Sequence, residues 1–308
     1  MKKIICSLLI LAAVLIISCT PNTQNTKTAV DTTLTHGPEK GTLVIVGGGM
    51  RDSAIVNEFI KLAGGMDAPI VVIPTASGAD TINEERVARF LTSVGATNVT
   101  VIHTYDPEVA NQDQFVEPIR KATGVWFGGG RQWRLVEAYG GTLAEKEIKA
   151  LLDRGGVIGG SSAGATIQGS FLARGDTQGN TIMMGDHKEG FNYLTNSAID
   201  QHLLVRNRQH DLIEIIRKQP HLLGIGLDEN TAIIVQGDEF EVIGESFVAI
   251  FDYSLWNENP GCVNPLPNDG KFFLLRSGDR YNVNTREVLN WRGGNSRNIF
   301  LEPTGEGL

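Results

Sequence analysis

The chain has 308 residues, of which 41% are apolar and 20% charged, and its formal net charge is −8 at pH 7. This is an ordinary globular composition, and a chain of this length can form one large domain or two small ones. The acidic balance and the lack of any basic run argue against nucleic acid as a partner.

The first 18 residues have the pattern of a secretory signal. A basic start precedes an apolar run over residues 4–17, which is shorter than the roughly 20 apolar residues of a membrane-spanning helix. Ile16-Ile17-Ser18-Cys19 resembles the lipobox of bacterial lipoproteins. We therefore predict a lipoprotein signal peptide over residues 1–18, lipidation of Cys19, and export to the bacterial cell envelope. An ordinary signal peptide with a chance cysteine is the alternative.

Residues 19–40 are rich in Thr and Asn and show no apolar periodicity, which predicts a flexible tether. The lipid on Cys19 would then be the only contact with the membrane. Because Cys6 leaves with the signal, Cys262 has no partner for an intrachain disulfide. Residues 41–308 are expected to form a single α/β domain, and the sequence leaves a homodimer open.

Short apolar runs alternate with helix-like segments in the first half of this domain. Strands are expected at 42–46, 70–73, 99–102, 124–127 and 156–158, and helices at 52–62, 84–94 and 142–153. This alternation predicts a mostly parallel sheet with helices on both faces. Ligands of such sheets bind beyond the carboxyl ends of the strands, so the site is expected there.

The pattern changes after residue 199. A helix is expected at 206–218, and strands at 224–227, 232–235, 240–243, 247–251 and 272–275. The strands at 232–235, 240–243 and 247–251 are predicted to be antiparallel.

The candidate nucleophile is Ser162. It lies in Gly160-x-Ser162-x-Gly164, directly after a buried strand and before a helix-compatible run. Small residues on both sides of the serine allow the sharp turn that exposes its hydroxyl, and the helix that follows favours negative charge there. Ser161 fits less well, because Ala163 stands two positions after it. The alternative is a glycine-rich turn that only packs tightly or binds phosphate.

The candidate base is His202, which ends Asp200-Gln201-His202 forty residues further on. A serine hydroxyl needs a base at neutral pH, and histidine titrates in the right range. His103, at the end of a strand, is the runner-up. A third group should orient the imidazole. Asp176 and Asp186 both lie between Ser162 and His202, and Asp176 is preferred.

Two other motifs bear on the site. Gly128-Gly129-Gly130 follows a strand and lets the backbone approach the nucleophile, so an amide of this loop and that of Ala163 are candidates for an oxyanion hole. Three glycines in an ordinary loop are the alternative. Asp228-Glu229 is a poor acid/base pair, because adjacent residues on a strand point to opposite faces. Gly47-Gly48-Gly49 fails as a dinucleotide-binding loop, because Asp52 stands where the third glycine belongs.

Together these motifs resemble cyanophycinase and the related dipeptidase E family of serine peptidases, over residues 41 to 251. The shared segments are Trp126-Phe127-Gly128-Gly129-Gly130-Arg131-Gln132, Gly160-Ser161-Ser162-Ala163-Gly164-Ala165, Ile199-Asp200-Gln201-His202, Arg206-x-Arg208 and Gly224-Ile225-Gly226-Leu227-Asp228-Glu229.

The resemblance implies a fold similar to class I glutamine amidotransferases, with serine in place of the nucleophilic cysteine. It implies exopeptidase-like cleavage next to aspartate, including β-aspartyl linkages, without metal or cofactor. By the same resemblance, Ser162 is the nucleophile, His202 is the base, and the amides of Gly129 and Ala163 are the oxyanion donors. The residues that correspond to substrate-pocket positions are Gln132, Asp200, Gln201, Arg206 and Arg208. The sequence departs from the family at Asp211, where cyanophycinase has a third arginine.

The leading hypothesis is therefore a serine-type peptidase that hydrolyses small or isopeptide-linked acidic peptides through an acyl-enzyme. Its partner would be a small peptide substrate. No His/Cys cluster has metal-ligand spacing, so no metal is expected. A non-catalytic, peptide-binding surface lipoprotein is one alternative, and an esterase or amidase with the same triad is another.

Overall fold

The computed structural model describes residues 35–51, 53–256 and 270–291. The predicted signal peptide, Cys19 and residues 20–34 of the predicted tether lie outside the described residues. Within the described ranges, no helix combines the length and the apolar character needed to cross a membrane.

A nine-stranded sheet forms the larger layer, in the order β14-β13-β10-β9-β1-β5-β4-β2-β3. Its first five strands along the chain pair in parallel: β1 (Thr42–Val46), β2 (Ile70–Ile73), β3 (Val99–Val101), β4 (Gly124–Phe127) and β5 (Val157–Ser161). Four later strands extend it in antiparallel fashion: β9 (Thr231–Gln236), β10 (Glu239–Gly244), β13 (Arg280–Asn282) and β14 (Glu287–Asn290).

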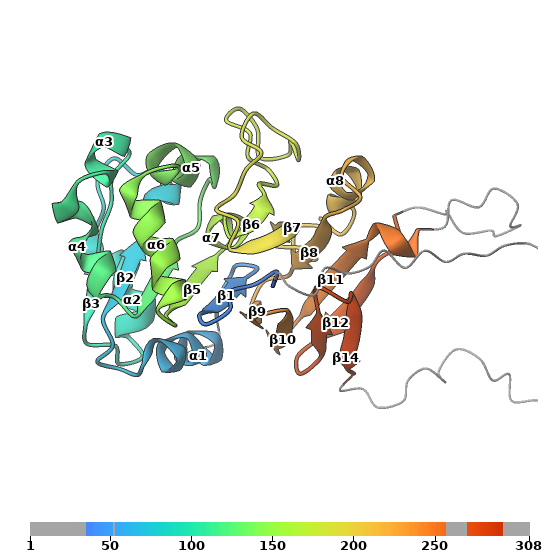
Figure 1. The fold of residues 1–308 in the computed structure, drawn as a ribbon, viewed down its shortest axis with the longest axis horizontal. Coiled ribbons are helices and arrows are strands. Elements are labelled where there is room, and N and C mark those ends of the chain that lie inside the picture. The colour runs from blue at the N-terminus through green and yellow to red at the C-terminus, as the bar shows by residue number, and fades with distance from the viewer. Residues whose placement is uncertain (1–34, 52, 257–269, 292–308) are drawn as a thin grey trace, which may run out of the picture. The chain divides into compact units, whose positions relative to one another are not determined.

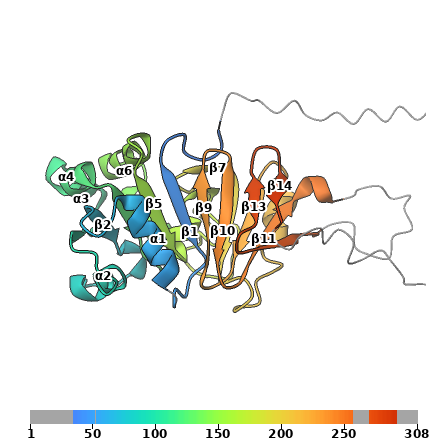
Figure 2. The same ribbon diagram turned by 90° about the horizontal axis from the view of Figure 1, so that it is seen from below.

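Helices cover both faces of the parallel strands (Figures 1 and 2). Successive residues of β1 point to opposite faces of the sheet, and both faces are apolar. Val44 packs with one layer of helices and Leu43 with the other. The first layer holds α1 (Ser53–Ala63) and α2 (Glu84–Thr92), and the second holds α3 (Pro107–Ala110), α4 (Asp113–Lys121), α5 (Trp133–Tyr139) and α6 (Leu143–Asp153).

A second, five-stranded sheet has the order β12-β11-β8-β7-β6. Its strands are β6 (Gly169–Phe171), β7 (Leu194–Gln201), β8 (Leu223–Leu227), β11 (Phe247–Asp252) and β12 (Phe273–Arg276). One face packs on the first sheet, with Ile225 and Val248 in the same core as Val235. The other face is covered by α8 (Leu212–Lys218), which buries Ile216 against Phe251. The fold is therefore α/β with a mostly parallel part and added antiparallel strands, as the sequence predicts.

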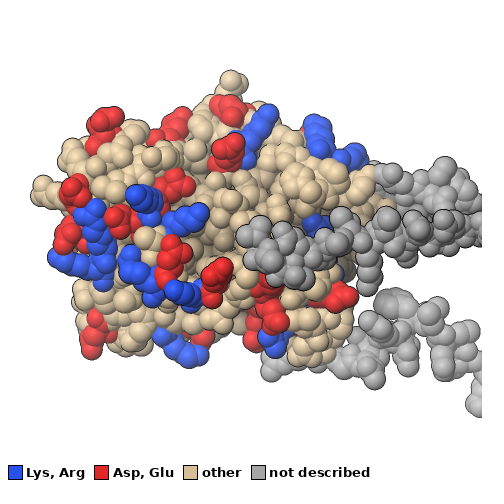
Figure 3. Space-filling view, in the orientation of Figure 1, with Lys and Arg blue, Asp and Glu red and all other residues tan. Residues whose placement is uncertain are grey.

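Three short elements complete the described chain: η1 (Thr75–Ser77), α7 (Ala163–Thr166) and η2 (Tyr253–Leu255). Acidic and basic side chains are interspersed on the face seen in Figure 3. On α4, for example, Arg120 lies within ion-pair distance of both Asp113 and Glu147.

One expectation about an element is wrong near the site. The helix predicted at 206–218 begins only at Leu212, because residues 203–207 form a turn after His202. The strand predicted at 247–251 is antiparallel as expected, and it pairs with β8 and β12 in the second sheet. Strand β7, which has no apolar run, was not expected.

The folded domain also begins earlier than residue 41. Gly37 donates its amide hydrogen to the carbonyl of Gly237 at 3.0 Å, and Gly237 donates to Pro38 at 3.0 Å. The amide of Thr195 donates to the carbonyl of His36 at 2.8 Å. Residues 36–38, assigned to the tether from sequence, are thus fastened to the β9–β10 turn and to the start of β7.

Candidate active site

Ser162 occupies a sharp turn between β5 and α7. Its backbone has φ 57° and ψ −112°, a region that costs a non-glycine residue about 1–3 kcal/mol. Its amide donates to the carbonyl of Val46 at 3.0 Å, which holds the turn against the end of β1. A Cβ at Gly160 would lie 2.1 Å from the carbonyl oxygen of Gly164. The close approach of these two residues explains the small residues around the serine, as the sequence predicts.

His202 lies directly against this serine. Its Nε2 is 2.9 Å from the Oγ of Ser162, although forty residues separate the two in sequence. His202 follows the last residue of β7 with φ 55°, and its amide donates to the carbonyl of Gly47 at 2.9 Å. The ends of β1, β5 and β7 therefore bring the predicted nucleophile and base together.

Glu229 is the carboxylate that orients the imidazole. Its Oε1 lies 2.7 Å from the Nδ1 of His202. The prediction of Asp176 is therefore wrong, and so is its alternative, Asp186. Asp176 instead accepts the amide hydrogens of Gln178 and Gly179 at 2.9 and 2.8 Å. Asp186 accepts the hydroxyl of Thr177 at 2.7 Å.

Glu229 could have been predicted from the sequence. It closes the segment 224–229 that carries part of the family resemblance, and it follows a predicted strand. Both predicted carboxylates lie between Ser162 and His202 in the chain, whereas Glu229 follows His202. Its neighbour Asp228 points elsewhere and accepts the amide hydrogens of Leu204 and Val205 at 2.9 and 3.1 Å.

The environment of His202 keeps the imidazole neutral near pH 7. Burial lowers its pKa from the usual 6.5, the hydrogen bond that it donates to Glu229 raises it, and the charge of Arg206 lowers it, with a net downward shift. A neutral Nε2 can accept the proton of the Ser162 hydroxyl, while Nδ1–H donates to Glu229.

The glycine-rich loop after β4 supplies backbone amides beside the serine. The amide of Gly128 donates to Ile73 at 3.0 Å, and that of Arg131 donates to Ala76 at 2.8 Å, so the loop is pinned on both sides of Gly129. A Cβ at Gly129 would lie 3.4 Å from the Cβ of Ser162. In the described part of the chain, the amides of Gly129 and Ala163 donate to no protein acceptor, which leaves both available to an oxyanion.

The glycines after β1 pack against the imidazole of His202 and the carboxylate of Glu229. Gly48 has φ 122°, and a Cβ there would lie 2.3 Å from the Cε1 of His202. A Cβ at Gly49 would lie 2.3 Å from the Oε2 of Glu229. The loop that superficially resembles a dinucleotide site thus has a packing role in the candidate triad.

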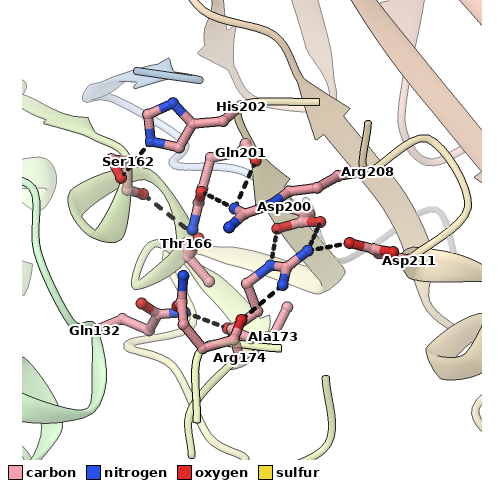
Figure 4. Close-up of polar contacts among 11 residues, drawn as sticks. Gln132, Ser162, Thr166, Ala173, Arg174, Asp200, Gln201, His202, Arg208 and Asp211 are labelled. Carbon is pink, nitrogen blue, oxygen red and sulfur yellow. Dashed lines mark hydrogen bonds and ion pairs between the residues drawn. The ribbon is translucent and has the colours of Figure 1, made fainter. Parts of the chain in front are cut away.

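The residues that resemblance assigned to the substrate pocket differ in accessibility. Gln132, Asp200, Gln201 and Arg208 are buried, and Arg206 is exposed. The guanidinium of Arg208 donates to the side-chain oxygen of Gln201 at 2.7 Å and to its carbonyl at 3.1 Å (Figure 4). Gln132 donates from Nε2 to the carbonyl of Ala173 at 2.5 Å.

Asp200 is engaged by a residue that the sequence did not single out. Arg174 donates from Nε to Oδ1 of Asp200 at 2.8 Å and from a terminal nitrogen to Oδ2 at 3.1 Å. The same guanidinium bonds to Asp211 and donates to the carbonyl of Asn180 at 2.7 Å (Figure 4). Asp211, the departure from the family pattern, is therefore a partner of this arginine.

His103, the runner-up base, belongs to a separate network. Its Nδ1 lies 2.8 Å from the Oγ1 of Thr75, which is also 2.6 Å from the hydroxyl of Tyr139. Among the residues that the structure describes, no group of three His, Cys, Asp or Glu side chains could hold a metal ion.

Comparisons with known proteins agree with this geometry. The sequence pattern of peptidase family S51 matches residues 43–243. The cyanophycinase of Geminocystis herdmanii is 33% identical over 259 residues, which cover 80% of this chain and 95% of that protein. The cyanophycinase of Synechococcus elongatus is 30% identical over 269 residues, with coverages of 83% and 84%. The crystal structure of a peptidase from an acI-B1 Actinobacterium superposes with a TM-score of 0.61 at 22% identity, and covers 80% of this chain and 98% of that one.

Proposed function

We propose, from the premise that the chain belongs to peptidase family S51, that this serine-type hydrolase cleaves small or isopeptide-linked acidic peptides through an acyl-enzyme. The observation that carries the proposal is the chain of two hydrogen bonds, 2.9 Å from Ser162 to His202 and 2.7 Å from His202 to Glu229. Nucleophile, base and orienting carboxylate in this order are the requirements for serine catalysis.

The geometry supports the following steps. Ser162 attacks the scissile carbonyl while Nε2 of His202 takes the hydroxyl proton, and Glu229 stabilises the imidazolium that forms. The amides of Gly129 and Ala163 bind the oxyanion of the tetrahedral intermediate. His202 then gives its proton to the leaving amine, which departs and leaves an acyl-enzyme. Water, deprotonated by the same imidazole, hydrolyses the ester and restores the free serine.

The acidic character of the substrate rests on two arginines beside the base. Arg206 and Arg208 lie on the segment directly after His202, and the charges of both groups reach its imidazole. A guanidinium pairs well with a carboxylate, because two parallel N–H groups match its two oxygens. The names of the curated relatives, which are cyanophycinases, support a substrate of this class.

A fluorophosphonate probe tests the proposal. The protein should be labelled covalently at Ser162, as located by peptide mass spectrometry, and should hydrolyse β-aspartyl or α-aspartyl dipeptides. A peptide-binding protein without catalysis would stay unlabelled. Labelling together with hydrolysis of simple esters or amides, and none of the acidic peptides, would assign an esterase or amidase instead.

The pKa of His202 predicts the acid limb of the activity profile. Only the neutral imidazole accepts the serine proton, and a lowered pKa keeps it neutral to lower pH, so kcat/KM should fall to half only below pH 6.5. Removing the cation in Arg206→Gln should move this midpoint upward. Lys218→Gln, an exposed change on α8, is the matched control and should leave the midpoint in place. A midpoint that does not move in Arg206→Gln would contradict this account of the imidazole.

The contact between Gly48 and the imidazole predicts a second effect. Gly48→Ala should place a methyl group against the ring and displace it, and a misplacement of about 1 Å is enough to lower kcat by roughly 100-fold. Gly65→Ala is the control, because Gly65 also has a positive φ of 107° but has open space around its Cβ. Both variants should lose stability on melting, and only Gly48→Ala should lose activity. Equal activities would show that the methyl group is accommodated.

Export and lipid anchoring through Cys19 are also proposed, on the sequence of residues 1–19 alone. Cells fed a labelled fatty acid should label the wild type and not Cys19→Ala. Labelling of both variants would refute the anchor.

A further inference from the structure

Arg174 is a fully enclosed cation close to the candidate active site. Only 2% of it is exposed, and it lies on the loop between β6 and β7 with φ 57°. Its guanidinium meets Asp200 with two bonds, and also contacts Asp211 and the carbonyl of Asn180 (Figure 4). Its guanidinium is therefore bonded on several sides, and it occupies the position that a bound cation would take.

The contacts of Arg174 limit what Asp200 can bind. This carboxylate is 0% exposed, and each of its oxygens already accepts a hydrogen from Arg174. A substrate ammonium or guanidinium would have to displace a planar cation that is held in a charge-assisted, two-bond pair. Asp200, which the resemblance placed in the substrate pocket, therefore has both carboxylate oxygens occupied by Arg174 and is not available to a substrate cation.

The other side chains of the predicted substrate pocket favour a substrate group with a negative charge. Within the described ranges, neither Arg206 nor Arg208 forms an ion pair with a carboxylate. Gln132, whose Oε1 is buried without a hydrogen-bond partner, offers only a neutral acceptor. Such an acceptor binds an amide N–H as well as an ammonium, so it does not require a free amino group.

We propose that Arg174 is the specificity-determining residue of this site: it fills the place at Asp200 and Asp211 that a cationic substrate group would take. The enzyme then binds its substrate through an anionic group at Arg206 and Arg208 and does not need a free amino group or a guanidinium. This inference rests on the proposed function, because it names the substrate class of the same site.

A matched pair of peptides tests it. β-Aspartyl-leucine and its N-acetyl derivative keep the same α-carboxylate next to the scissile bond, and only the first has a free ammonium. For the wild type, kcat/KM should agree within about threefold, which is less than the loss of one charge-assisted hydrogen bond would give. Calorimetry with Ser162→Ala should give dissociation constants in the same ratio, independently of catalysis.

Substitutions of Arg174 and Asp200 should change the ratio of kcat/KM for the two peptides. Arg174→Gln uncovers Asp200 and should then favour the free-amine peptide by about tenfold or more. The double variant Arg174→Gln/Asp200→Asn removes both charges and should return the ratio to near one. Lys218→Gln, an exposed change on α8 outside the cluster, is the control and should resemble the wild type.

The proposal is overturned if acetylation lowers wild-type kcat/KM more than about tenfold, or if folded Arg174→Gln shows no new preference. It is also overturned if Ser162→Ala binds neither peptide. Should Arg174→Gln fail to fold, the wild-type ratio decides alone. Failure of the proposed function is read separately, as absence of fluorophosphonate labelling at Ser162.

Discussion

Ser162→Ala is expected to lower kcat/KM for acidic peptides by roughly 10⁴- to 10⁶-fold, because the variant lacks the hydroxyl that contacts the base. The backbone amides of Gly129 and Ala163 remain, so a small residual rate above that in water should persist. Steady-state assays with purified protein, checked by circular dichroism for an intact fold, measure the loss.

Two further variants make this result specific. Ser161→Ala removes the neighbouring hydroxyl on β5 and should change kcat/KM by less than about threefold. His202→Ala should be nearly as inactive as Ser162→Ala, and the double variant should be little worse than either, because the pair acts as one unit. Additive losses would mean that the two side chains do not share a step.

Glu229→Gln is expected to lower kcat by about 10⁴-fold, because an amide can present its N–H to Nδ1 and stabilise the wrong tautomer of His202. The imidazolium would also lose its counter-charge during the reaction. The fall should appear in kcat more than in KM, since Glu229 touches the base and not the substrate. Pre-steady-state and steady-state kinetics at saturating peptide measure it.

Asp176→Asn is the matched control for this prediction. Its carboxylate caps two backbone amides in the β6–β7 loop, and an asparagine oxygen can still accept both hydrogens. Kinetic constants should stay within a few-fold of the wild type. If Asp176→Asn were the inactive variant and Glu229→Gln the active one, the assignment of the orienting carboxylate would be reversed.

Local signals in the sequence were enough for the parallel half of the fold. The strands expected at 42–46, 70–73 and 124–127 have the observed limits, because a strand covered on both faces is a continuous apolar run. Ser162 and His202 could also be predicted from the sequence. Ser162 stands in a turn motif after an expected strand. His202 was identified from the chemistry of a base and from the family resemblance, because the strand that it follows was not expected.

The remaining features depend on contacts that no local pattern reveals. Strand β7 reads LTNSAIDQ, and its polar Asp200 is buried only because Arg174 neutralises it from another loop. The helix expected at 206–218 starts late, because Asp228 accepts the amides of Leu204 and Val205 and stabilises a turn instead. The role of Glu229 likewise depends on a pairing between segments 27 residues apart.

The attachment of residues 36–38 has a consequence for how the enzyme meets macromolecular surfaces. The carbonyl of His36 binds the second residue of β7, whereas His202 directly follows that strand, which at about 3.3 Å per residue puts roughly 20 Å between the two points. Anything joined upstream of residue 35, whether a bilayer, an affinity bead or a fusion partner, is therefore linked near the end of β7 that lies farther from the reactive serine.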